Sequence, residues 1–315
     1  MCICVSSGRG FGLGLAAVLA CAVVAGGGAG AQTGFDFSNS LVPEEAFVSG
    51  GVPRDGIPSI DQPRLAPPSQ SGGLADSALV VGVEIDGDAR AYPLSILNRH
   101  EIANDEVGGT PVAVTWCPLT ASAVVFARNA EFGVSGLLYN SNLVLYDRAT
   151  ESLWPQLAGR ALAGPQAGTE LRRLPAVVLS WGVWRARYTD SRVLAPPAGA
   201  PGDYGRDPYA GYHRSSGTMF PVSTPDARLP AKAKVLGVRI GNTARAYPME
   251  AIQRAAEGML EDEIAGRVLR VYPAGANTAY AADAEGNTLT ATPAYWFAWS
   301  AFNPDTGLYV APVTQ

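Results

Sequence analysis

The chain has 315 residues, and its 28 acidic residues outnumber its 23 lysines and arginines, giving a formal net charge of −5. Nucleic acid is therefore excluded as an expected partner, because binding a phosphate backbone needs a basic face. The 36 glycines and 24 prolines predict frequent turns, which favour short strands over long helices.

Residues 1–31 have the pattern of a secretory signal peptide. Arg9 supplies a short basic region, residues 11–24 are apolar but too short to cross a bilayer as a retained helix, and residues 29–31 (Ala-Gly-Ala) fit a cleavage site. The alternative is a lipoprotein anchored through Cys21, which the residues around it favour less. We therefore expect an exported protein, periplasmic or extracellular, with no transmembrane segment in the mature chain.

Residues 32–78 are rich in proline and glycine, have weak periodicity, and predict an extended arm over the surface. A first repeat, residues 79–194, follows, with one helix predicted after Pro93 and a second beginning after Ser180, where Trp181 and Trp184 share helical spacing. The predicted strands are Leu79–Ile85, Ala89–Tyr92, Glu101–Val107, Pro111–Trp116, Val124–Phe126, Gly133–Tyr139 and Leu143–Tyr146.

The chain contains a second copy of this pattern. Val80–Leu97 reads VVGVEIDGDARAYPLSIL, and Val235–Ile252 reads VLGVRIGNTARAYPMEAI, an offset of 155 positions. The offset between Trp184 and Trp299 is 115, so the second copy is 40 residues shorter, with the loss falling near residues 128–169 of the first copy. The sequence thus predicts an internal repeat.

Residues 195–233 form a Pro/Gly-rich connector, which we expect to lie over the first copy, and residues 234–315 form the shortened second repeat. Within it, Val268–Tyr272 aligns with Val112–Trp116. The expected fold class is a β-rich α+β architecture. Two homologous small twisted sheets or partial barrels pack together, each with one or two short helices.

Cys117 is the one cysteine outside the predicted leader, so the mature chain has no internal disulfide. It ends a predicted strand immediately before Pro118, a rigid position at a rim. A cysteine there is either a nucleophilic or metal-binding thiolate or a small buried apolar residue. The sequence leaves both readings open.

His100 lies near Cys117 in the chain, and its imidazole could deprotonate the thiol or share a soft transition metal (Cu, Zn or Fe) with it. The alternative is a hydrogen-bonded structural histidine. Glu101 and Asp105 could orient the ring, or simply be solvated. A second histidine, His213, lies in the connector, where it is either a lid over the first copy or a surface residue.

A polar segment of the first copy has no counterpart in the second. It interrupts an apolar run with hydrogen-bonding side chains, which either line a ligand pocket or turn the chain. The candidate pocket residues are Tyr139, Asn140, Asn142, Asp147 and Arg148.

Several of these stretches resemble the bacterial and archaeal family catalogued as domain of unknown function 3179. They are Asp55–Pro58, Ala91–Leu94, Asn98, His100–Ile102, Asn104-Asp105, Thr115, Cys117–Leu119, Gly133–Asn142, Tyr146–Arg148, Asp203–Tyr209 and Trp296–Trp299. The resemblance implies no established activity. The family commonly has a CxxC here, and this chain has Thr120 in place of the second cysteine, so dithiol redox cycling does not transfer to it.

Two functions follow as hypotheses. The first is thiol or soft-metal chemistry at a small site around Cys117 and His100. The alternative is a non-catalytic periplasmic or envelope module that binds a small ligand or an envelope protein and is degenerate relative to its family. In a third interpretation the thiol is structural and the chain is an inactive family member.

Overall fold

The computed structural model describes residues 34–70, 73–199, 203–255, 257–275 and 277–310. The predicted signal peptide, with its cleavage site and Cys21, lies outside the described residues. Among the residues described, no helix is long and apolar enough to cross a membrane. The fold is β-rich α+β, as predicted, with five sheets and five short α-helices in the described part.

The first half, residues 79–194, begins with a hairpin, a helix and three further strands. A second group of strands follows, and the half ends with a helix and one short strand. Its elements are β3 (Leu79–Ile85), β4 (Asp88–Pro93), α2 (Leu94–His100), β5 (Ile102–Val107), β6 (Thr110–Cys117), β7 (Ser122–Ala127), β8 (Phe132–Tyr139), β9 (Asn142–Asp147), β10 (Leu153–Pro155), β11 (Arg173–Leu174), β12 (Val177–Ser180), α3 (Trp181–Arg187) and β13 (Arg192–Leu194).

The second half, residues 234–310, has the same order of elements without the added group. Its elements are β14 (Lys234–Ile240), β15 (Thr243–Pro248), α5 (Met249–Gln253), β16 (Leu260–Ile264), β17 (Arg267–Pro273), β18 (Ala279–Asp283), β19 (Ala291–Tyr295), α6 (Trp296–Phe302) and β20 (Gly307–Leu308). The connector between the halves carries α4 (Ala210–Arg214).

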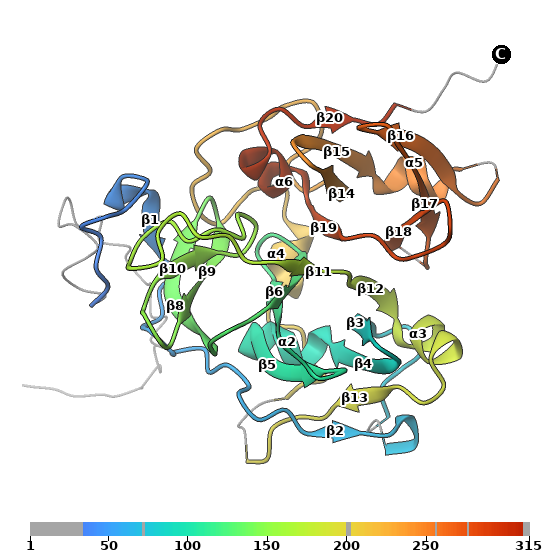
Figure 1. The fold of residues 1–315 in the computed structure, drawn as a ribbon, viewed down its shortest axis with the longest axis horizontal. Coiled ribbons are helices and arrows are strands. Elements are labelled where there is room, and N and C mark those ends of the chain that lie inside the picture. The colour runs from blue at the N-terminus through green and yellow to red at the C-terminus, as the bar shows by residue number, and fades with distance from the viewer. Residues whose placement is uncertain (1–33, 71–72, 200–202, 256, 276, 311–315) are drawn as a thin grey trace, which may run out of the picture.

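Strand order is also equivalent in the two halves. The orders β12-β3-β4-β13 and β7-β6-β5 of the first half match β19-β14-β15-β20 and β18-β17-β16 of the second, and β2 and β11 are additional edge strands of the first half. The remaining sheet, β1-β8-β9-β10, has no counterpart and lies at one end of the molecule (Figure 1). Strands β8, β9 and β10 fall within the segment that the sequence comparison placed outside the second copy.

The arm does more than cover the surface. It carries the short helices η1 (Glu44–Ala46) and η2 (Pro68–Gln70) and the strands β1 (Phe47–Ser49) and β2 (Leu65–Ala66). Strand β1 pairs with β8, and β2 pairs with β13, so the arm completes the edges of two sheets. Phe47 is buried, which fixes the arm through apolar packing.

Most predicted strands are confirmed to within two residues, and the predicted helix after Pro93 runs to His100. Helix α3 begins at Trp181 as predicted, although the Ser180 side chain makes no capping hydrogen bond. Trp184 packs against Gly82 of β3 at a distance that leaves no room for a Cβ, and Trp299 packs on Gly237 of β14 in the same way. The glycine is therefore required by a close approach in each half.

The aligned register of one strand was wrong by one residue. Val112 pairs with Asp105 across β5 and β6, and Leu269 pairs with Asp262 across β16 and β17, so Leu269 and not Val268 is the counterpart of Val112. Leu269 is fully buried, whereas Val268 is 41% exposed. A shift of one residue moves a side chain to the other face of a strand, and here burial shows which register is right.

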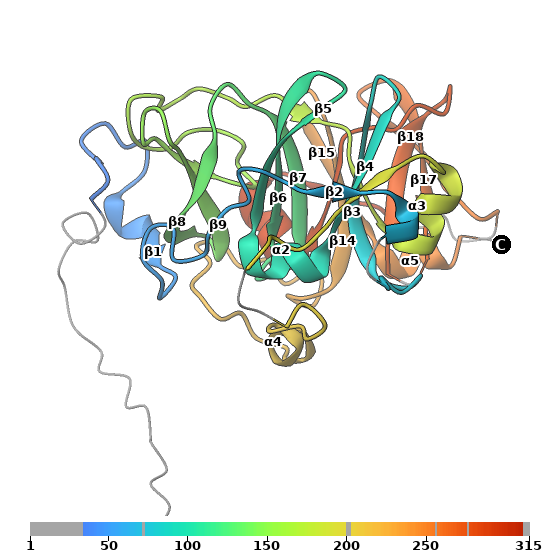
Figure 2. The ribbon, with the colours of Figure 1, turned by 90° about the horizontal axis from the view of Figure 1, so that it is seen from below.

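The two halves pack on each other reciprocally. Strand β12 of the first half contacts β18 of the second, and β19 of the second contacts β7 of the first. At the second of these contacts, the backbone N–H of Tyr295 donates to the carbonyl of Thr120 at 2.8 Å. Figure 2 shows α4 projecting beside α2 on one side of the strands.

Candidate functional site

A cavity of about 410 Å³ lies where both halves and the connector meet. One wall is formed by α2 and by the turn between β6 and β7, the opposite wall by the start of β14 and the end of β19, and the connector closes a third side. The lining residues are Ala78, Leu79, Leu94, Ser95, Asn98, Trp116, Ala121, Tyr204, Gly205, Asp207, His213, Lys234 and Tyr295.

The connector is held on the first half by hydrogen bonds from α2. Asn98 Nδ2 donates to Asp207 Oδ1 at 3.1 Å, and Arg99 Nη2 donates to the carbonyl of Asp203 at 2.9 Å. The prediction that the connector covers the first copy is therefore confirmed. His213, offered either as a lid or as a surface residue, lies in this covering segment and faces the cavity.

The second half contributes charge and aromatic surface to the cavity. Tyr295 OH lies 2.9 Å from Nδ1 of His213, whose Nε2 is 3.9 Å from Asp207 Oδ2. Desolvation lowers the pKa of the half-buried His213 and that of Lys234, although Lys234 is an exposed residue at the start of β14. Within the described chain the Lys234 ammonium has neither a hydrogen bond nor an ion pair, so it is a cation without a protein counter-charge at the cavity wall.

Cys117 lies at the end of β6, behind the wall that Trp116 and Ala121 form. It is 1% exposed, and its sulfur accepts a hydrogen bond from the backbone N–H of Leu143 at 3.4 Å. Burial, with a smaller contribution from the nearby Glu101 carboxyl, raises the pKa of the thiol to about 11. The thiol is consequently neutral at pH 7 in this conformation.

Glu101 is the most unusual side chain of the first half. It follows α2 with a positive φ of 56°, an uncommon conformation for a residue with a Cβ. It is 7% exposed, and within the described chain its carboxyl group has no hydrogen-bond partner. Burial raises its pKa to about 8, so the group is largely protonated at neutral pH.

The connector covers this buried acid and thiol with an aromatic ring. Burial and the charges of Glu101 and Cys117 raise the pKa of Tyr209, which places all three groups in one electrostatic neighbourhood. Tyr212 packs in the same apolar cluster as Cys117, and its hydroxyl donates to the carbonyl of Leu119 at 2.8 Å. The connector therefore buries the sulfur together with the sheet that contains β9.

His100 is engaged elsewhere. Its Nδ1 lies 2.8 Å from the carbonyl oxygen of Pro58, and its Nε2 lies 2.8 Å from the hydroxyl of Tyr204. In the described structure no hydrogen bond joins His100 to Cys117. Their joint catalytic or metal-binding role stays a prediction, which requires His100 to release one of these two partners.

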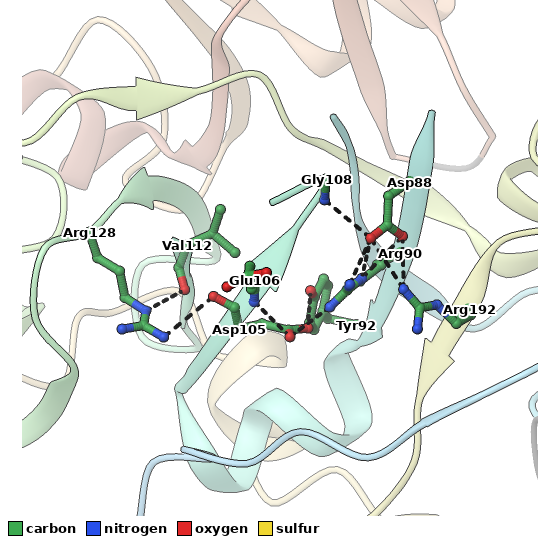
Figure 3. Close-up of polar contacts among 9 residues, drawn as sticks. All are labelled: Asp88, Arg90, Tyr92, Asp105, Glu106, Gly108, Val112, Arg128 and Arg192. Atoms are coloured by element: carbon green, nitrogen blue, oxygen red, sulfur yellow. Dashed lines mark hydrogen bonds and ion pairs between the residues drawn. The ribbon is translucent and has the colours of Figure 1, made fainter. Parts of the chain in front are cut away.

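The interpretation that Glu101 or Asp105 orients His100 is wrong. Asp105 accepts hydrogen bonds from Arg90 Nη1 at 2.7 Å and from Tyr92 OH at 2.6 Å, as Figure 3 shows. Asp88 binds the other side of the Arg90 guanidinium at 2.6 Å. Both acids of this network already bind protein cations or hydroxyls. We therefore infer that the network stabilises the fold.

Position 120 belongs to a second buried network. Thr120 Oγ1 lies 2.7 Å from Ser122 Oγ and accepts from Asn142 Nδ2 at 3.1 Å, while Ser122 Oγ and Asn142 Nδ2 both donate to Gln156 Oε1. Every one of these side chains is buried. The network joins the β6–β7 turn to the extra sheet and keeps the hydroxyl at position 120 beside the lone thiol.

The five candidate pocket residues have protein partners, and they are absent from the lining of the cavity described above, so their ligand-binding role stays a prediction. Tyr139 packs its ring on Phe302, Asn140 accepts from the Ser223 N–H, Asn142 lies in the network just described, Asp147 accepts from Trp154 Nε1, and Arg148 pairs with Asp55.

The side chains in the described part of the chain include no group of three or more histidines, cysteines or acids that could hold a metal ion. A metal at Cys117 would therefore need ligands brought there by a change of conformation. Sequence reasoning missed Lys234, because nothing in its local pattern separates it from an ordinary strand-edge lysine. From the sequence, Glu101 was considered only as a residue that could orient His100. Its position next to His100 was the one sequence feature that could have marked it as a candidate site residue.

The fold and site define a β-rich protein built of two similar halves, with an open cavity between them and a buried thiol in the first half. The family described as "Protein of unknown function (DUF3179)" matches residues 54–288, and the chain belongs to this family. The predicted resemblance is thus confirmed. Comparisons with curated proteins and with solved structures gave no match.

Proposed function

We propose that this protein is a non-catalytic binding module for a small molecule, which occupies the cavity between the two halves. The observation that carries the proposal is the unpaired ammonium of Lys234 in a cavity walled by the rings of Trp116, Tyr204 and Tyr295. Sites for small organic ligands are typically concave and mostly apolar, with a few polar groups that fix orientation. A location between two packed units is also common for such sites.

The lining indicates the chemistry of the ligand. Aromatic side chains contribute large apolar contact areas, which suits a flat or aromatic body. Lys234 is exposed to solvent and makes no ion pair within the described chain, so its ammonium is free to pair with an anionic group on the ligand. The ligand class is therefore a small organic acid with an apolar or aromatic body.

Binding is favoured over catalysis by the state of Cys117. A neutral, buried thiol with a pKa near 11 is a poor nucleophile and a poor metal ligand. Thiol or soft-metal chemistry at Cys117 is the second candidate function, and one observation favours it. The unpartnered carboxyl of Glu101 beside the sulfur is the kind of buried, shifted acid found at reactive sites.

Two further proposals accompany this function. The leader pattern supports export to the periplasm or the cell exterior, where the protein would meet its ligand. The equivalent element order and registers support an ancestral internal duplication, after which one copy was shortened.

The test is isothermal titration calorimetry with 2-naphthoate and its neutral analogue 2-naphthol. We expect naphthoate to bind one site and to bind more tightly than naphthol, because only the carboxylate meets Lys234. Lys234→Met should weaken naphthoate binding about tenfold and leave naphthol nearly unchanged. Arg254→Met removes an exposed cation directly after α5; it is the matched control and should change neither. Equal affinities of the two probes, or equal effects of the two variants, would refute the proposal.

A further inference from the structure

We propose that the outer face of the connector carries a second binding site, for a phosphate or sulfate group, formed by three arginines. A cavity of about 800 Å³ lies there, and Arg99, Arg206 and Arg214 line it together with Asp207. The three cations come from α2, from a connector turn and from the end of α4. This site shares Gly205 and Asp207 with the organic-acid cavity but none of the three arginines, so the inference does not rest on the proposed function.

Arg99 is positioned by the connector and still has unused donors. Its Nη2 donates to the carbonyls of Asp203 and Arg206 at 2.9 and 3.3 Å, which fixes the plane of the guanidinium. Its Nε is buried without a hydrogen-bond partner. No hydrogen bond in the described chain occupies its Nη1, so this nitrogen, and not the buried Nε, is the donor that remains for a ligand.

The other two arginines lack protein counter-charges. In the described part of the chain, neither the Arg206 nor the Arg214 side chain makes an ion pair or a hydrogen bond. The nearest acid in the lining, Asp207, accepts hydrogen bonds from Asn98 Nδ2 and from the N–H of Tyr209. The cavity therefore holds an excess of two positive charges in a chain whose formal net charge is −5.

The geometry of the donors points to a tetrahedral oxyanion. A guanidinium presents its donors as a planar fork that suits phosphate and sulfate oxygens, and charge-assisted hydrogen bonds of this kind are among the strongest in proteins. The ligand could be the free ion or the same group as part of a larger molecule. In the second case the rest of the molecule extends beyond the three arginines. An ester would add contacts that the free ion cannot make.

The site is tested by calorimetric titration with inorganic phosphate, sulfate and phenyl phosphate at low ionic strength. We expect one site for phosphate, with affinity that falls as sodium chloride is added, because salt screens exposed charges. Tighter binding of phenyl phosphate would identify an ester as the source, and equal binding would identify the free ion. No phosphate binding at about 10 mM would overturn the proposal.

The variant Arg206→Gln/Arg214→Gln should bind phosphate at least about tenfold more weakly. Arg254→Gln removes an exposed cation directly after α5 and should bind phosphate as the natural chain does. Arg206→Gln alone, with an expected smaller loss, serves if the double variant fails to fold, which circular dichroism would reveal. Equal weakening by Arg206→Gln and Arg254→Gln would show that the arginines act through net charge only, and would refute the site.

Discussion

The two halves share their supports and differ in their chemistry. Each half packs a tryptophan on a strand glycine and each joins an arginine and a tyrosine to one aspartate, which in the second half are Arg245, Tyr247 and Asp262. Only the first half has Cys117, Glu101 and His100. The side-chain arrangements present in both halves are therefore best explained by a role in folding. The residues present in one half only are the better candidates for function.

The position of the thiol shows the difference most directly. Ala274 occupies the place of Cys117, since its N–H donates to Thr278 across the same strand ends that pair Cys117 with Ser122. The sheet that only the first half has supplies Leu143, whose N–H binds the sulfur. The added sheet thus seals the thiol, and a half without the thiol has no such cover.

The largest expected effect tests the shared support. Trp184→Ala and Trp299→Ala should each lower the free energy of unfolding by about 3–5 kcal/mol, because both indoles are buried against a glycine that cannot fill the gap. Chemical denaturation followed by circular dichroism measures both. If one variant cost less than about 1 kcal/mol, the two tryptophans would not have equivalent roles.

The paired aspartates should differ in a graded way. Asp105 and Arg90 are 8% and 10% exposed, whereas Asp262 and Arg245 are 14% and 31% exposed. Asp105→Asn should therefore cost about 3 kcal/mol, since it leaves a buried cation short of a partner. Asp262→Asn should cost about 1 kcal/mol. Urea denaturation of the two variants gives the comparison, and equal losses would contradict it.

Glu101 should give the first half a pH dependence. Its pKa is 4.5 in a model peptide and about 8 when folded, so the folded state keeps a proton that the unfolded state loses. The free energy of unfolding should fall as pH rises from about 4.5 to about 8. Glu101→Gln should remove that slope and be the more stable protein at pH 9.

The matched control for this prediction is Glu250→Gln. Glu250 is exposed on α5 and pairs with Arg254, so its replacement should leave the pH dependence unchanged. Unfolding curves at several pH values between 4 and 9 supply the data. An identical slope in Glu101→Gln and in the natural chain would show that Glu101 is ionised when folded.

The smallest expected stability effect is at Cys117. Cys117→Ala, which makes the first half match Ala274, should cost about 1 kcal/mol. In a chain beginning at Gln32, Ellman's reagent should label Cys117 at least about 100-fold more slowly in the folded protein than in urea, because the thiol is buried and neutral. Fast labelling at pH 7 would favour the thiol-chemistry hypothesis over binding.

Much of the fold could be predicted from local signals. Pro93 and Pro248 mark helix starts, and Gly87, Gly108 and Gly266 mark hairpin turns at positive φ. The strands between them alternate or run apolar, which fixed their positions to within two residues. The register of β17 was not fixed by this pattern, because Val268 and Leu269 are both apolar and only packing separates them.

The site could be predicted only in part. Its walls come from segments near positions 79, 94, 116, 204, 213, 234 and 295, and no local pattern states that these meet. The position of the connector over the first half was predicted from its place in the chain. The lack of partners at Lys234 and Glu101 could not be predicted, because it depends on which residues pack around them. Burial decides whether an acid is solvated or raised to a pKa of about 8, and burial is a property of the assembled chain.

The parallel pairing of β13 with β4 has a consequence for the order of folding. Arg192 pairs with Arg90, so closing that sheet in the first half requires a chain loop of roughly 100 residues, whereas Arg245 and Gly307 close the second half over roughly 60. Longer closures slow folding, since their entropy is lost before the contacts form. The shorter half should therefore form first and offer its β18 and β19 as a template on which the longer half, with its added sheet, completes itself.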